Sequence, residues 1–329
     1  MNKLLLFTFV VIFVSIPIYP VKMTKKERDT LKSMKNIDTL FVLTEAFTYP
    51  EHTEFLSRNI AYIQDNGSYI LAVNRDRYLG IWSKKSTFLG AVGSIGKGPG
   101  EFISPWGAFF EKDKLFVIDG ALKVLHQYDI PNNKIIFNDR VDISHVLKLS
   151  PISVVPYGQY YYFIYASMWK GSPRIVKVDS SFKTINSYAE ISIDENVSVM
   201  GTWKITPSYV IVTDAWRHEK GKNTLSYDSN INIYNHNGKI IRKINRNNKE
   251  IVSLICDENE KFLILRYDDR YEIFAIDNGK KIIEVKRNSD LEKSMYPNFY
   301  SSEWGSYFYT LTHDEVKKTM TFSKYTVKL

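Results

Sequence analysis

The feature that most constrains the fold of this chain is a short β-strand pattern that recurs from about Ser57 to the C-terminus. Segments such as Tyr69–Val73 and Lys261–Leu265 are rich in β-branched and aromatic residues, and Gly, Asn and Asp turns separate them. Turns such as Asn235–Gly238 suit hairpins because Asn and Gly tolerate a positive φ. Beyond one short segment near residues 24–35, no helical periodicity is sustained. The pattern therefore predicts an all-β fold of antiparallel hairpins.

The repeating unit is a four-stranded meander. Six units of about 45 residues fit into the chain, and this length is typical of propeller blades. The expected blades span residues 57–92, 105–143, 151–190, 197–246, 250–287 and 297–329. The last blade lacks its outer strand, which Thr39–Thr44 could supply, closing the ring and removing both sheet edges. We predict a six-bladed β-propeller of four-stranded antiparallel blades, its ring closed by an N-terminal strand. A two-domain β-sandwich protein is the alternative, although no Pro/Gly/Ser-rich linker separates two halves.

The N-terminus resembles an export signal. Lys3 precedes the 15-residue apolar run Leu4–Ile18, which has the length of a secretory h-region and is shorter than a spanning helix of roughly 20 residues. No small-x-small cleavage site follows, and an uncleaved membrane anchor is the alternative because the distal flank is strongly basic. That flank contains Lys22, Lys25, Lys26 and Arg28. We expect a signal peptide or anchor at 1–20, a connector at 21–37, and the propeller at 38–329, in an exported, periplasmic or envelope-associated protein.

Charge and cysteine content exclude several classes of function. The chain has 44 Lys+Arg and 36 Asp+Glu, a net charge of +8, but the basic residues are spread out and form no stripe for nucleic acid. Its one cysteine, Cys256, excludes an internal disulfide framework and a Cys-based zinc or iron–sulfur site. Cys256 falls on the expected inner strand of the fifth blade, where it suits a small core residue.

The most unusual segment is Gly93–Phe102, with the sequence GSIGKGPGEF. It has neither Walker spacing nor a G-x-G-x-x-G pattern. We interpret it as a structural crossing between blades, in which glycines allow a positive φ, Glu101 caps backbone donors and Phe102 fills the space between blades. Cradling of a ligand is the alternative. The motif residues are Gly93, Gly96, Gly98, Pro99, Gly100, Glu101 and Phe102.

The Gly-x-Gly-Pro-Gly-Glu-Phe motif and the strand Leu115–Asp119 after it resemble the NHL-like six-bladed β-propeller family of the Bacteroidota cell envelope. The likeness covers residues 78–119, and the other blades match only in rhythm. It implies a propeller fold and an envelope location. Lipoprotein members of the family have a leader cysteine that this chain lacks, and no catalytic residue carries over.

The expected topology places the candidate binding residues at one end of the ring. In a meander a-b-c-d, the b–c loops and d–a crossings emerge at one pole, and the a–b and c–d turns at the other. The b–c loops are longer and contain Arg and Trp, which are common at binding hot spots. The predicted ligand-binding residues are Arg75, Arg77, Trp169, Trp216, Arg217, His218, Arg266, Asp268 and Arg270. Solvated rims with ion pairs at the blade edges are the alternative.

Three functions remain open from the sequence. The first is a non-enzymatic envelope propeller that binds a ligand or partner through the b–c loops, either a glycan that stacks on aromatic rings or an acidic peptide held by arginine. The second is a lyase or hydrolase with an axial metal, for which His218, Asp268 and His313 could meet, although no H-E-x-x-H or G-x-S-x-G motif occurs. The third is a purely structural interaction module. We expect no catalytic or metal-binding residue, no cofactor and no nucleic acid, and a monomer with an unknown protein or glycan partner and possible membrane attachment through Leu4–Ile18.

Overall fold

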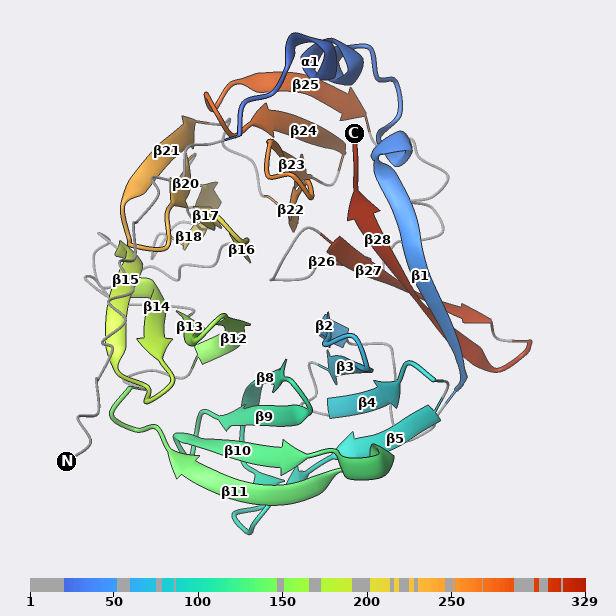
Figure 1. Cartoon of the computed structure of the whole chain (residues 1–329), viewed down its shortest axis with the longest axis vertical. Helices are drawn as coiled ribbons and strands as arrows, with labels where there is room; N and C mark the ends of the chain where they lie inside the picture. The colour runs from blue at the N-terminus through green and yellow to red at the C-terminus, as the bar shows by residue number, and fades with distance from the viewer. Residues whose placement is uncertain are drawn as a thin grey trace, which may run out of the picture.

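The computed structural model is a six-bladed β-propeller, in which six four-stranded antiparallel sheets surround a central axis (Figure 1). The structure describes residues 21–51, 60–74, 79–85, 87–146, 151–165, 173–190, 202–213, 216–218, 225–227, 230–245, 251, 253–267, 269–286, 299–301, 307–314 and 316–329. The sandwich alternative is therefore wrong, because each sheet packs its two faces against neighbouring sheets of one ring.

The first three blades follow the chain in order from the inner to the outer strand. Blade 1 contains β2 (Ile60–Asp65), β3 (Tyr69–Asn74), β4 (Leu79–Ser83) and β5 (Thr87–Val92). Blade 2 contains β8 (Pro105–Glu111), β9 (Lys114–Asp119), β10 (Val124–Asp129) and β11 (Ile136–Asp142). Blade 3 contains β12 (Pro151–Tyr157), β13 (Tyr160–Tyr165), β14 (Pro173–Asp179) and β15 (Thr184–Glu190).

Blades 4 and 5 repeat this order, and blade 6 takes its outer strand from the other end of the chain. Blade 4 contains β16 (Trp203–Ile205), β17 (Val210–Thr213), β20 (Asn230–Tyr234) and β21 (Ile240–Asn245). Blade 5 contains β22 (Ser253–Cys256), β23 (Phe262–Arg266), β24 (Arg270–Ala275) and β25 (Lys281–Lys286). Blade 6 contains β26 (Phe299–Ser301), β27 (Tyr307–Asp314), β28 (Thr319–Val327) and β1 (Phe41–Pro50).

The ring closes within blade 6, as predicted from Thr39–Thr44. Strand β1 pairs antiparallel with β28, from Phe41 opposite Val327 to Pro50 opposite Thr319. Every other blade takes its four strands in chain order from one segment of the chain, with the hairpin β18–β19 inserted in blade 4. The two ends of the propeller chain are thus held in one sheet by main-chain hydrogen bonds, and β28 is paired on both sides, with β27 and with β1.

The segment before β1 is packed against blade 5. Helix α1 (Lys25–Lys32) is capped at its N-terminus by Thr24, whose side chain forms a capping box with Glu27. Leu31 is fully buried and belongs to a core cluster that includes strands of blades 5 and 6. The 3-10 helix η1 (Ile37–Leu40) then leads into β1. Residues 21–37 therefore dock on the ring in addition to connecting to it.

The core lies between the blades. Strand β23 is buried along its whole length, as expected for a sheet that is covered on both faces. Cys256 on the inner strand β22 is fully buried, and burial raises the pKa of its thiol. No helix among the described residues is long and apolar enough to cross a membrane.

The connections define two poles, which we name for what they contain. The turn pole consists of the a–b and c–d turns, and the loop pole consists of the b–c loops and d–a crossings. Bonds between a–b turns of successive blades confirm that the blades are aligned the same way: Asn66 Nδ2 donates to the Lys112 carbonyl at 2.6 Å, and Tyr157 Oη donates to the Pro207 carbonyl at 2.8 Å. Ser208 N likewise donates to Glu260 Oε1 at 3.0 Å.

Candidate binding face at the loop pole

Blade 4 has the most elaborate described b–c connection. Between β17 and β20 the chain forms an added two-stranded hairpin of β18 (Trp216–His218) and β19 (Leu225–Tyr227). Trp216 is the Cα partner of Tyr227, and His218 is the partner of Leu225. Three predicted binding residues, Trp216, Arg217 and His218, therefore share one strand of this hairpin. The predicted residues Arg75, Arg77, Trp169 and Asp268 lie outside the described part of the chain.

Arg270, another predicted ligand-binding residue, is buried at the start of β24. Its Nη1 lies 2.9 Å from Asp269 Oδ1 and its Nε lies 3.3 Å from Glu272 Oε1, while the guanidinium carbon sits 4.3 Å from the Tyr267 ring centroid. Burial alone would lower the pKa of Arg270, but these carboxylates outweigh it and raise the pKa. Arg270 thus belongs to the ion pairs of the blade edge rather than to a free ligand-binding surface.

Arg266 is also buried, at the end of β23, with Ser253 of the inner strand as its Cα partner. The two arginines therefore flank the b–c loop of blade 5 from inside the blade. The sequence predicted Arg270 on the loop itself and Arg266 immediately before it. A signal for the burial of Arg270 was available, because Glu272 follows two residues later and alternate residues of a strand share a face.

The Gly93–Phe102 crossing folds onto itself. Its short strands β6 (Ser94–Ile95) and β7 (Glu101–Phe102) pair in parallel, and the carboxylate of Glu101 accepts a hydrogen bond from Gly98 N at 2.7 Å. A backbone turn with N–H groups directed inward can bind an anion. In this loop the chain's own carboxylate takes that position, which weighs against a phosphate-type ligand.

Phe102 explains why glycine is needed at the start of the crossing. Its ring is buried in the core cluster between blades 1 and 2, with its centroid 5.0 Å from that of His126. Gly93 has φ of +79°, and a Cβ there would come within 1.9 Å of the Phe102 ring. Gly100 also has a positive φ, and its carbonyl accepts a bond from Tyr128 Oη at 3.1 Å.

Asp119 holds the base of this crossing, a role that the sequence analysis did not assign. Its carboxylate accepts backbone N–H groups on both sides: Ile103 at 2.6 Å, and Ala121 and Leu122 at 2.9 and 3.0 Å. Asp119 therefore fixes the end of the crossing to the b–c turn of its own blade. Its position at the end of a buried strand, followed by Gly120, was the available signal.

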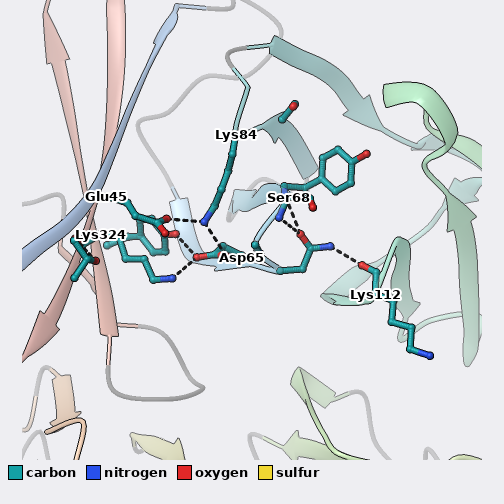
Figure 2. A network of polar contacts seen from close by, with 12 residues as sticks. Glu45, Asp65, Ser68, Lys84, Lys112 and Lys324 are labelled. Carbon is teal, nitrogen blue, oxygen red and sulfur yellow. Dashed lines mark hydrogen bonds and ion pairs between the residues drawn. The ribbon is translucent and has the colours of Figure 1, made fainter.

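Two polar clusters lie between blades at the turn pole. The first joins blades 6 and 1 around Asp65, which is almost wholly buried (Figure 2). Asp65 Oδ2 accepts from Lys324 Nζ at 2.7 Å and from Tyr309 Oη at 2.5 Å, and Lys84 Nζ approaches Oδ1 at 3.1 Å from the other side. Lys84 also pairs with Glu45 of β1 at 2.6 Å. Burial would raise the pKa of Asp65, but the bonds and charges of its partners outweigh it and lower the pKa to about 2.

The second cluster joins blades 3 and 4 around His236, a residue of the β20–β21 turn. Its Nε2 lies 2.9 Å from the Thr206 carbonyl and therefore carries the proton, which makes Nδ1 the acceptor for Tyr162 Oη at 2.6 Å. Its ring stacks on Tyr157 with centroids 4.7 Å apart. Burial lowers the pKa of His236, and the nearby charge of Lys177 adds to this effect. In both clusters the central side chain bonds to other protein groups, and each cluster joins two neighbouring blades.

No group of three or more His, Cys, Asp or Glu side chains capable of holding a metal exists among the described residues. His313, one of three predicted candidates for an axial metal, lies near the end of β27, the second strand of blade 6, with Nδ1 3.9 Å from Glu51 Oε1. The other two candidates are His218, whose side chain is outside the described part, and Asp268, which is wholly outside it.

The fold defines the chain as a six-bladed β-propeller protein. A family model described as a 6-bladed beta-propeller matches residues 51–212. The chain is similar to the crystal structure of a Bacteroides fragilis protein that is titled a putative exported protein. The TM-score is 0.57 and the identity is 12%, over 89% of this chain and 97% of that chain. BamB from Moraxella catarrhalis gives a TM-score of 0.42 and 10% identity over 80% of this chain and 71% of that chain. The search of curated proteins gave no match.

The family model supports a propeller family, and the Bacteroides fragilis structure supports the fold. The likeness to NHL-type propellers, and the glycine motif as a mark of that family, remain predictions.

Proposed function

We propose that the protein is a non-enzymatic propeller of the cell envelope that binds a protein or glycan partner through its loop pole. The observation that carries the proposal is the uneven elaboration of the two poles. The loop pole carries the added hairpin β18–β19 and the folded crossing Gly93–Phe102, neither of which a four-stranded blade requires. At the turn pole the described c–d connections are short, such as Ser180–Lys183 and Asn235–Lys239. Loops that exceed the needs of a rigid scaffold commonly carry its binding function.

The envelope location rests on the N-terminal sequence, where the apolar run Leu4–Ile18 has the length of an export signal. The similar Bacteroides fragilis structure is titled a putative exported protein, which agrees with this location. The glycan or acidic-peptide preference rests on the residue types of the loops, with Trp216 and Arg217 in the added hairpin.

Site-specific photocrosslinking in the native host tests the loop-pole assignment. A benzophenone amino acid replaces Arg217 in one variant and Lys183, an exposed residue of the turn pole, in the matched control. We expect a discrete protein adduct from position 217 and none of the same mass from position 183. An adduct of the same mass from both positions, or from 183 alone, overturns the assignment.

A glycan partner would give no protein adduct, so a glycan array is the second measurement. The wild-type chain should then bind at least one glycan class, and Trp216→Ala with Arg217→Ala should weaken that binding by at least about tenfold. The proposal is contradicted if position 217 gives no adduct and no glycan binding depends on Trp216 and Arg217. That result favours the purely structural module.

A further inference from the structure

The turn pole collects lysines that are scattered along the sequence. Each of the six blades places an exposed lysine at its c–d turn or, in blade 6, at the end of β28. These residues, which we call the lysine ring, are Lys85, Lys134, Lys183, Lys239, Lys280 and Lys328. The strand registers and the bonds between a–b turns place all of these positions on one side of the molecule.

The surface of the same turns is strongly positive. Counting also the first residues of the strands that follow, the described a–b and c–d turns expose nine lysines. They are the six of the lysine ring together with Lys112, Lys114 and Lys281. Among those described turn residues the exposed carboxylates are Asp113 and Glu258, and Glu258 lies 3.3 Å from Lys328. Asp277, in the c–d turn of blade 5, is paired with Arg28 at 2.6 Å. The pole is therefore complementary to an anionic surface.

Exposed aliphatic side chains lie beside the lysine ring at the start of the outer strands. Ile136, Ile185 and Ile240 are 49%, 43% and 41% exposed, and each lies one or two residues after a ring lysine. Binding of a soluble polyanion requires cationic groups but no exposed aliphatic side chains. Aliphatic side chains interleaved with lysines are typical of proteins that rest on anionic bilayers, where the cations meet headgroups and the aliphatic groups enter the interface.

The start of the described chain lies at this pole. Helix α1 is tied to the turns of blade 5 by Glu27, which pairs with Lys261 at 2.5 Å, and by Arg28, which pairs with Asp277. The predicted apolar run ends at Ile18, seven residues before α1 begins at Lys25. A linker of that length spans at most about 25 Å. A membrane-held N-terminus would therefore keep the α1 side of blade 5, with its turns at the turn pole, close to the bilayer.

We propose that the lysine ring docks the propeller on an anionic phospholipid surface with the loop pole facing away. This inference goes beyond the proposed function, because it assigns a second surface with a different ligand. It also explains how the loop pole stays accessible to a partner when the protein is close to a membrane.

Vesicle flotation of the full chain tests the proposal. Phosphatidylcholine vesicles are compared with vesicles containing about one third phosphatidylglycerol, which makes the surface anionic. The ratio of the two partition coefficients removes the contribution of Leu4–Ile18, because that run is apolar and uncharged. We expect wild type to favour the anionic vesicles by about tenfold or more at low salt, and high salt to reduce this preference.

Two triple variants with the same change in net charge separate the lysine ring from general basicity. Lys134→Glu, Lys183→Glu and Lys239→Glu should bring the anionic preference close to one. Lys97→Glu, Lys123→Glu and Lys318→Glu, at exposed sites of the loop pole, should retain most of it. The milder set Lys134→Gln, Lys183→Gln and Lys239→Gln should give an intermediate preference, and circular dichroism should show all variants folded.

An equal loss in both charge-reversal variants, or no anionic preference in wild type, overturns the proposal. Tight binding to heparin without vesicle binding also overturns it and assigns the ring to a soluble polyanion. Crosslinking at position 217 does not depend on the ring lysines, so the proposed function and this inference can fail separately.

Discussion

Blades 3 and 6 lie on opposite sides of the ring (Figure 1) and carry the same trio of side chains. Each has two tyrosines at alternate positions of its second strand and a lysine on its third. The trios are Tyr160, Tyr162 and Lys177 in blade 3, and Tyr307, Tyr309 and Lys324 in blade 6. In both blades the lysine is the Cα partner of the second tyrosine. Its Nζ lies over the ring of the first, at 3.8 Å in blade 3 and 4.4 Å in blade 6.

The blade next to each trio provides a different partner for the lysine. In blade 6 the lysine and tyrosine meet the carboxylate of Asp65, whereas in blade 3 Lys177 Nζ meets the backbone carbonyl of His236 at 3.1 Å. We call the cluster around Asp65 the charged seam and the cluster around His236 the neutral seam. In the charged seam the Asp65 carboxylate neutralises Lys324. In the neutral seam the described contacts of Lys177 are a carbonyl and aromatic rings. The charged seam also includes Glu45 of β1, so it ties together the two strands that close the ring. The comparison indicates that ion pairs add to main-chain pairing and aromatic packing at the closure, whereas neutral hydrogen bonds and ring stacking join blades 3 and 4.

Removal of the carboxylate should give the largest effect. Asp65→Asn leaves Lys324, and in part Lys84, without a counter-charge, so we expect a loss of about 3–5 kcal/mol in the free energy of unfolding. Urea unfolding at neutral pH measures it, with Asp113→Asn, an exposed turn residue, as the matched control expected within about 0.5 kcal/mol of wild type. A loss below about 1 kcal/mol would mean that the carboxylate does not hold the closure.

Acid should remove part of the stabilisation that the Asp65 carboxylate provides. The pKa of Asp65 is about 2 in the folded chain against an ordinary 3.8, so its stabilisation is present above the ordinary value and is lost as pH falls from about 4 towards 2. We expect the stability difference between wild type and Asp65→Asn to shrink by about 2 kcal/mol over that range. The measurement is urea unfolding at stepped pH. A difference that stays constant with pH would contradict the low pKa.

The neutral seam should be less costly to break. His236→Leu removes the acceptor of the Tyr162 hydroxyl and the ring stacked on Tyr157, and we expect a loss of about 1–3 kcal/mol. His145→Leu, at an exposed site, is the control and should be close to neutral. An effect as large as that of Asp65→Asn would remove the contrast between the seams.

The pH dependence of the neutral seam should fall in a different range. Because the pKa of His236 is lowered on folding, the unfolded chain takes up the proton first as pH falls below about 6.5, and this lowers the stability of wild type. His236→Leu should lose that part of the acid sensitivity between pH 7 and about 5.5. Identical pH profiles for both proteins in this range would indicate that the histidine is not held neutral.

The two lysines should give the smallest effect and the sharpest contrast. Lys177→Met removes a buried charge that contacts a carbonyl and an aromatic ring but no carboxylate among the described residues, and the His236 carbonyl still accepts from Tyr188 Oη at 2.9 Å, so we expect a change within about 1 kcal/mol. Lys324→Met takes a counter-charge from Asp65 and should cost about 2 kcal/mol. Equal effects in thermal unfolding would show that the carboxylate and the carbonyl are equivalent partners.

The blades could be predicted from the sequence because their signals are local. Turn pairs such as Asn237–Gly238 and the spacing of apolar strands set the bounds of each meander, and the missing sixth outer strand indicated the role of β1. The seams could not be predicted. His236 is a turn residue in the sequence, and its partners are Tyr162 of blade 3 and Thr206 in the a–b turn of its own blade, 74 and 30 residues away.

The candidate surfaces show the same limit. The lysine ring comes from turns far apart in the chain, so the net charge of +8 looks evenly spread until the fold gathers these turns at one pole. Conversely, Arg270 looks like an exposed loop residue until its pairing with Glu272 within the blade is known.

The pairing of β1 with β28 has a consequence for how the chain is made. Thr44 donates to the carbonyl of Lys324, 280 residues later, so the first strand to leave the ribosome finds its partner only when synthesis is nearly complete. Until then the edges of blade 6 and of β1 remain open to other chains, and such non-local pairing makes folding slow. A shortened chain lacking β28 would therefore be expected to aggregate rather than to form a five-bladed ring.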